Sequence, residues 1–151
     1  MRMIRIMMNT ITPLNAGAKE ATMHPDPHPR GRHALVDHWL KLQIQVRCAL
    51  DPRQLARVRA YLNTGLQIAR LGVLPAERVH LRMLHNLLQA AHDPALPEYW
   101  RCACLEHLAQ PLAGVRLMLA VRDPLALQAI EAAVDVARER LTPPHCNGSA
   151  C

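Results

Sequence analysis

Residues 93–123, DPALPEYWRCACLEHLAQPLAGVRLMLAVRD, contain the features that decide the fold. The stretch opens on an Asp-Pro pair, and its last residue, Asp123, is followed by Pro124. Asp before Pro is typical of a helix start, because the carboxylate accepts from free amides of the first turn and Pro needs no donor there. Pro111 lies between the two pairs and predicts a helix break. We therefore expect two short helices, one on each side of Pro111.

Apolar residues recur with the period of amphipathic helices on both sides of this stretch. The expected helices span residues 34–50, 52–71, 75–91, 98–109, 111–121 and 124–141. Their short connections predict antiparallel neighbours. The helix pairs begin about every 36 to 41 residues, close to the spacing of helical-hairpin solenoids, although the tetratricopeptide consensus is absent. The sequence predicts an all-α fold of about six helices in three antiparallel hairpins, a small TPR-like solenoid.

The first of these segments, residues 34–50, carries two patterns. Its second half alternates apolar and polar residues, which is typical of a strand. The apolar residues of one helical face are Leu35, Trp39, Leu42, Val46 and Ala49. A lone strand needs a partner, and the chain offers only the poor segment 3–8, so helix is the better interpretation.

The two ends of the chain differ in composition from the middle. Residues 1–33 are rich in Pro, Gly and His and lack apolar periodicity, which predicts a disordered or extended N-terminal extension. The helical-hairpin domain is expected to span residues 34–142, followed by a flexible tail at 143–151. The histidines of the extension have Pro between them and no Cys or carboxylate partner in register, so we expect no metal site there.

Composition limits the class of protein. The chain has 151 residues, no Phe and five Cys, an odd number that fits a reducing cytoplasm better than a disulfide framework. We found neither a signal peptide nor a run of about 20 apolar residues that could span a membrane. We therefore expect a cytoplasmic protein. Residues 34–142 carry 13 Lys/Arg and 10 Asp/Glu, a mild balance that does not indicate nucleic-acid binding.

Catalytic and metal-binding patterns are weak. The only Ser stands at position 149, and no Gly-rich phosphate loop precedes a helix. Cys104 and His107 lie three apart on one expected helix, with no third group to orient them. Cys102 and Cys104 diverge by about 200° on a helix and cannot hold one ion together. The sequence favours a protein without enzyme activity, cofactor or metal.

The chain from Leu71 to Leu141 resembles the helical-hairpin chaperones of type III secretion needle subunits, the YscG/PscG type. The resemblance rests on a series of motifs: ARLG at 69–72, AERV at 76–79, PAL at 94–96, Glu98, Trp100, Cys104, Leu108, DP at 123–124 and ARERL at 137–141. With a looser match of the first two helices, it covers about 105 of the 151 residues. The Glu that follows the cysteine in that family is displaced here, to Glu106.

The resemblance implies a chaperone that pairs with a small co-chaperone and holds the amphipathic helix of a needle subunit in an apolar groove, which keeps the subunit soluble and unpolymerised. The residues expected to line the groove are Leu81, Leu84, His85, Leu88, Leu112, Val115 and Leu119. The residues expected at the co-chaperone face are Trp39, Leu42 and Tyr61. Trp100 and Cys104 are expected to be scaffold between the groove helices. In this interpretation the partners are small helical proteins in a heteromeric complex, with no nucleic acid and no membrane insertion.

A second interpretation is a small helical DNA-binding transcriptional regulator. Its phosphate contacts would come from Arg53, Arg57, Arg59 and Arg70 in the second expected helix. No clear helix-turn-helix turn follows that helix, so the chaperone interpretation is preferred.

Overall fold

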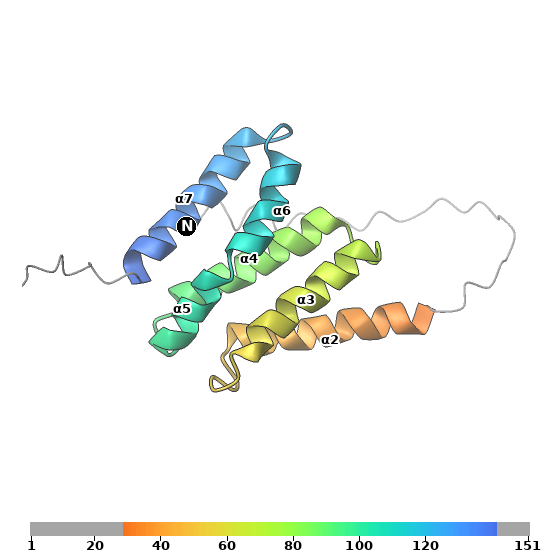
Figure 1. Ribbon diagram of the computed structural model, residues 1–151, viewed down its shortest axis with the longest axis horizontal. Helices are drawn as coiled ribbons and strands as arrows, with labels where there is room; N and C mark the ends of the chain where they lie inside the picture. The colour runs from red at the N-terminus through yellow and green to blue at the C-terminus, as the bar shows by residue number, and fades with distance from the viewer. Residues whose placement is uncertain (1–28, 142–151) are drawn as a thin grey trace, which may run out of the picture.

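The computed structural model describes residues 29–141, which form six α-helices and no β-strand (Figure 1). The helices are α2 (Pro29–Arg47), α3 (Ala56–Arg70), α4 (Ala76–His92), α5 (Glu98–Glu106), α6 (Ala109–Leu119) and α7 (Pro124–Leu141). The prediction of an all-α fold with about six helices is confirmed. None of the helices in 29–141 is both long and apolar enough to cross a membrane.

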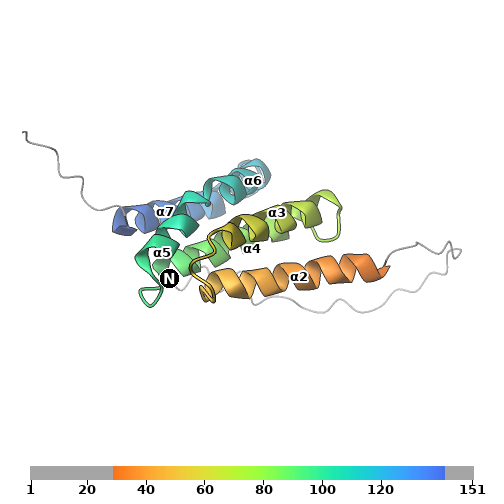
Figure 2. The same cartoon turned by 60° about the horizontal axis from the view of Figure 1, so that its bottom comes forward.

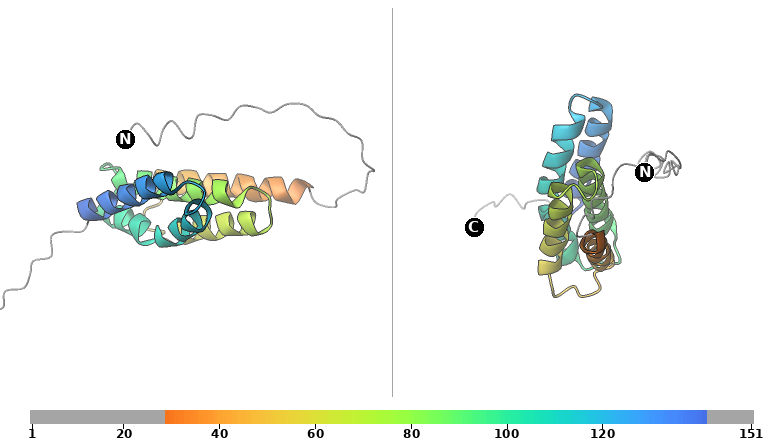
Figure 3. Two further views of the ribbon diagram at one scale, coloured as in Figure 1. Left: turned by 90° about the horizontal axis from the view of Figure 1, so that it is seen from above. Right: turned by 90° about the vertical axis from the view of Figure 1, so that its right-hand side faces the viewer.

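Helix α4 lies at the centre and contacts each of the other five helices. Helix α2 and the α6–α7 hairpin lie on opposite sides of α4 (Figures 1 and 2). Seen along the molecule, α2, α4 and α7 lie in one layer and α3 and α6 in the other (Figure 3). Because α5 and α6 both pack on α4, the helices do not form three equivalent hairpins. The TPR-like solenoid is not confirmed.

Helix α2 begins at Pro29, five residues before the expected start of the domain. Pro is tolerated at the first helical position because its missing N–H has no partner there anyway. Residues 31–34 are exposed, so they lengthen the helix without joining the core. The remaining predictions about the N-terminal extension and the C-terminal tail concern residues outside 29–141.

The side chains of α2 decide between its two patterns. Trp39, Leu42 and Val46 are buried, as the helical face predicts, whereas Ile44 of the alternating pattern is 58% exposed. The helix interpretation of this segment is therefore confirmed.

The three Asp-Pro pairs within residues 29–141, at Asp51, Asp93 and Asp123, behave differently from one another. Asp123 caps α7 as expected, since its Oδ1 accepts from Ala126 N at 3.0 Å. Asp93 accepts from Ala95 N at 3.0 Å, but it closes a turn three residues before α5. Asp51 does not start α3, which begins only at Ala56. Its carboxylate is bound by Arg57 at 3.3 Å instead.

The core is aliphatic, with three large aromatic side chains that are fully buried: Trp39, Tyr61 and Trp100. Trp100 Nε1 donates to the carbonyl oxygen of Val46 at 3.0 Å and so joins α5 to the end of α2. Cys104 is fully buried, and burial raises the pKa of its thiol to about 12. Both residues are structural, as expected, and Cys104 is kept in its unreactive thiol form.

Candidate functional site

The residues expected to line the partner groove come together where α4 packs on α6, but most of them are inside the protein. Leu84 and Leu88 of α4 belong to the buried core, as do Leu112, Val115 and Leu119 of α6. Only Leu81 and His85 are partly exposed. The core positions are already covered by the protein's own helices, so they leave no surface for a partner unless α4 and α6 separate.

The contact between α4 and α6 depends on a close approach at Gly114. A Cβ atom at this position would lie 2.3 Å from Nδ1 of His80, so only glycine fits beside the ring as it stands. That Nδ1 atom is buried and has no hydrogen-bond partner within the described residues. Burial lowers the pKa of His80 and favours its neutral form at the helix contact.

The residues expected at the co-chaperone face form the core of the α2–α3 hairpin. The rings of Trp39 and Tyr61 stack with centroids 5.7 Å apart and planes 11° apart. Leu42 is also buried, and the guanidinium carbon of Arg82 lies 5.7 Å from the centroid of Trp39. Burial raises the pKa of Tyr61 above its ordinary value. These three positions stabilise the hairpin from within and are not available at its surface.

Gly65 explains how α3 comes close enough for this stack. A Cβ atom there would lie 2.6 Å from Sδ of Met83 and 2.9 Å from Nε1 of Trp39. Trp39 Nε1 has no hydrogen-bond partner in residues 29–141. The ring of Trp39 in α2 therefore packs against Gly65 in α3.

The three most exposed large apolar side chains of residues 29–141 lie at the other side of α4, at the connection between α6 and α7. Leu117 is 89% exposed, Val121 is 96% exposed and Leu125 is 75% exposed. We call these three residues the apolar tip. They recur every four residues, a spacing visible in the sequence. Apolar periodicity, however, predicts which side of a helix is buried. It therefore did not indicate these exposed residues as a site.

Two ion pairs fix the apolar tip on the rest of the protein. Arg122 in the α6–α7 connection donates to Glu77 of α4, and this hydrogen bond lowers the pKa of the Glu77 carboxyl. Arg116 Nε lies 2.6 Å from Glu131 Oε1 and joins α6 to α7. The connection between these helices is therefore held in place although its apolar side chains are exposed.

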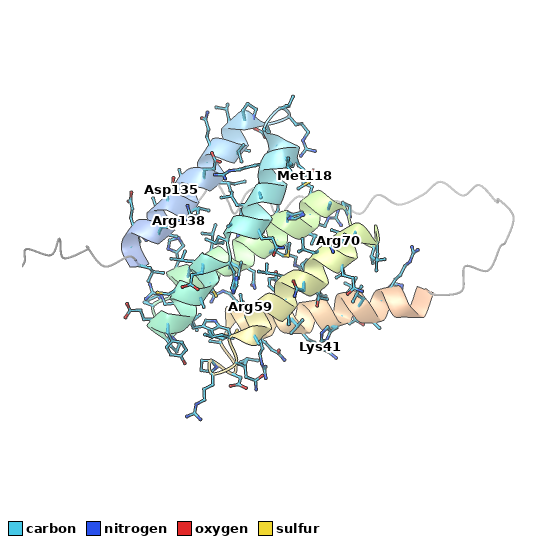
Figure 4. The ribbon with its side chains drawn as sticks, viewed as in Figure 1. Lys41, Arg59, Arg70, Met118, Asp135 and Arg138 are labelled. Atoms are coloured by element: carbon cyan, nitrogen blue, oxygen red, sulfur yellow. The ribbon has the colours of Figure 1, made fainter. Side chains whose placement is uncertain are left out.

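Charge is distributed unevenly between the two halves of the domain. Residues 29–71 carry eight Lys/Arg and two Asp/Glu, a net charge of +6, whereas residues 72–141 carry seven and eight, a net charge of −1. Figure 4 shows Lys41 on α2 and Arg59 and Arg70 on α3. The mild average over the whole domain concealed this segregation.

Residues 29–141 contain no group of three or more His, Cys, Asp or Glu side chains that could hold a metal ion. Cys48, Cys102 and Cys104 are free thiols, and of these only Cys48 is exposed. The two surface features considered further are the apolar tip and the basic first hairpin. In comparisons with known proteins, no family model, curated protein or solved structure matches the chain.

Proposed function

We propose that this protein is a non-enzymatic chaperone or adaptor that binds an amphipathic helix of a small partner protein. The observation that carries the proposal is the apolar tip, in which three large aliphatic side chains are at least 75% exposed. Burying one such side chain against a partner contributes about 1.5 to 3 kcal/mol. Large apolar side chains left this exposed are available to a partner protein.

The partner chemistry follows from the shape and charge of the apolar tip. Three large aliphatic side chains at one helix connection suit the apolar stripe of another helix. Arg116 and Arg122 border the tip and are more than half exposed while paired, so they favour a partner helix with acidic residues beside its stripe. The resemblance to needle-subunit chaperones supplies the specific candidates, a type III secretion needle subunit and a small co-chaperone in the bacterial cytoplasm.

The test is co-expression with small helical proteins encoded nearby, followed by size-exclusion chromatography and mass identification. The wild type is expected to recover a stoichiometric complex. The double variant Leu117→Asp/Leu125→Asp is expected to lose the partner while retaining its helical circular dichroism. Leu50→Asp is the matched control, since Leu50 is 63% exposed at the α2–α3 connection, away from the tip.

The possible outcomes test the apolar tip and the proposed function separately. Recovery of the partner by the tip variant would contradict the apolar tip as its binding site. Substitution of Leu84 or Leu119 by Asp cannot serve this purpose, because both side chains are buried and a buried unpaired charge destabilises the fold. Failure of the wild type to bind any small helical protein would contradict the proposed function itself.

A further inference from the structure

The outer face of α3 is a polar and basic stripe. Its exposed residues are Ala56, Arg59, Asn63, Gln67 and Arg70, and the helix contains no acidic residue. Arg59 and Arg70 are 11 residues apart, so on a regular helix their directions differ by about 20° and their Cα atoms are about 16 Å apart. Neither forms an ion pair with the part of the chain that the structure describes.

The stripe arginines differ from two other arginines of the first hairpin, which are paired locally. Arg47 Nη1 lies 2.8 Å from Asp93 Oδ2, and Arg57 is paired with Asp51. The two stripe arginines are thus the charges of α3 that still lack a counter-ion within residues 29–141. Their desolvation by an anionic ligand would break no existing ion pair.

The composition of the stripe selects the class of ligand. Protein interfaces have apolar or aromatic residues at their centre, and the stripe has only Ala56. Helices that bind membrane surfaces insert a wide apolar face, and that face of α3 is buried against the core. Interfaces with nucleic acid are polar and strongly positive, and Arg, Asn and Gln are side chains that contact phosphates and base edges.

We propose that the outer face of α3 binds duplex DNA, with Arg59 and Arg70 on phosphates of opposite strands and Asn63 and Gln67 between them. The major groove of B-DNA is about 12 Å wide and admits a helix, so arginines about 16 Å apart reach both of its walls. The deep, narrow major groove of duplex RNA does not admit side chains in this way. The surface is separate from the apolar tip, so the inference does not depend on the proposed chaperone function.

The test is fluorescence anisotropy of a labelled DNA duplex of about 30 base pairs titrated with the full chain, at salt from about 50 to about 200 mM. The variant Arg59→Gln/Arg70→Gln is expected to bind roughly tenfold more weakly at low salt and to reduce the slope of log K against log salt by about two. The matched control is Arg138→Gln/Arg140→Gln, which removes the same charge from α7. Figure 4 shows that Arg138 lies on a different part of the molecule from the stripe. The control is expected to bind within about threefold of the wild type.

A third variant, Arg59→Lys/Arg70→Lys, keeps the charge and is expected to restore most of the affinity, since attraction between the arginines and the phosphates supplies most of the binding free energy. Circular dichroism confirms that each variant is folded. The proposal is overturned if the wild type does not bind the duplex at low salt, or if the α7 control loses as much affinity as the stripe variant. It is also overturned if polyglutamate or phosphatidylserine vesicles compete for the stripe while duplex DNA does not, which would assign the surface to an acidic protein or to a membrane.

Discussion

The α2–α3 hairpin and the α6–α7 hairpin both pack on α4, yet they are built and exposed in different ways. The first has a stacked Trp39–Tyr61 pair inside, and on its outer face Arg59 and Arg70 form no ion pair within residues 29–141. The second approaches α4 through Gly114, pairs its arginines with Glu77 and Glu131, and exposes large aliphatic side chains. The two hairpins on either side of α4 therefore present different surfaces, one charged and one apolar. The two surfaces suit ligands of different chemistry.

The interior of the two hairpins should differ most in the cost of truncating a large side chain. Trp39→Ala removes a fully buried ring and its stack with Tyr61, so we expect a loss of about 3 to 5 kcal/mol in the free energy of unfolding, measured by urea denaturation. Leu117→Ala in the other hairpin is the control and should change stability by less than about 0.5 kcal/mol, because its side chain is in water. Equal losses in the two variants would contradict the burial that distinguishes the hairpins.

The contact of α6 with α4 is tested at Gly114. Gly114→Ala should destabilise the protein by about 1 to 3 kcal/mol, because the new Cβ overlaps the ring of His80 and the ring must move. The double variant Gly114→Ala/His80→Ala should recover part of this loss, which a double-mutant cycle would measure. Gly31→Ala on α2 meets no atom within 4 Å and should stabilise the helix slightly. A neutral Gly114→Ala variant would show that the two helices are not held this closely.

A smaller effect should appear in the pH dependence of stability. Burial lowers the pKa of His80, His85 and His92 on α4; Arg47 adds to the effect at His85, and Arg140 and Arg101 add to it at His92. The unfolded chain therefore binds more protons than the folded chain once the pH falls below the ordinary histidine pKa of about 6.5. The stability conferred by neutral histidines is fully present above that pH and is lost as the pH falls through the lowered pKa values.

Urea denaturation at about pH 7.5 and about pH 5.5, a range above the ordinary pKa values of Asp and Glu, would measure this loss. His80→Gln should reduce the loss, since the half-buried side chain at the α4–α6 contact then no longer titrates. A protein that is more stable at the lower pH, or a His80→Gln variant with an unchanged pH dependence, would contradict the assignment.

Much of the fold could be predicted because local patterns were consistent with packing. The apolar face of α2 is an example: Trp39, Leu42 and Val46 are buried as expected. Helix starts were less predictable. The same Asp-Pro pair caps a helix at Asp123, whereas the Asp51 carboxylate is bound by Arg57 and α3 begins only at Ala56. The dipeptide alone therefore does not decide where a helix starts.

The predicted groove shows why surface assignments need the fold. The resemblance placed Leu84, Leu88 and Val115 in a partner groove, but apolar residues on a helix face are usually core. Their burial between α4 and α6 follows that rule, while the accessible apolar residues lie at a helix connection that periodicity does not address. The charge of the first hairpin was likewise present in the sequence, but only its position on one hairpin, with few acidic neighbours, makes it a surface.

The sequence by itself determined the helical class, the approximate helix bounds and the aliphatic core, because these follow from propensity, capping and the period of apolar residues along a single helix. Tertiary structure alone decided that α4 is central, that Gly65 and Gly114 mark close approaches, and that the apolar tip and the α3 stripe are left exposed. The physical reason is that exposure depends on which helices cover one another, and this is set by contacts between residues far apart in the chain.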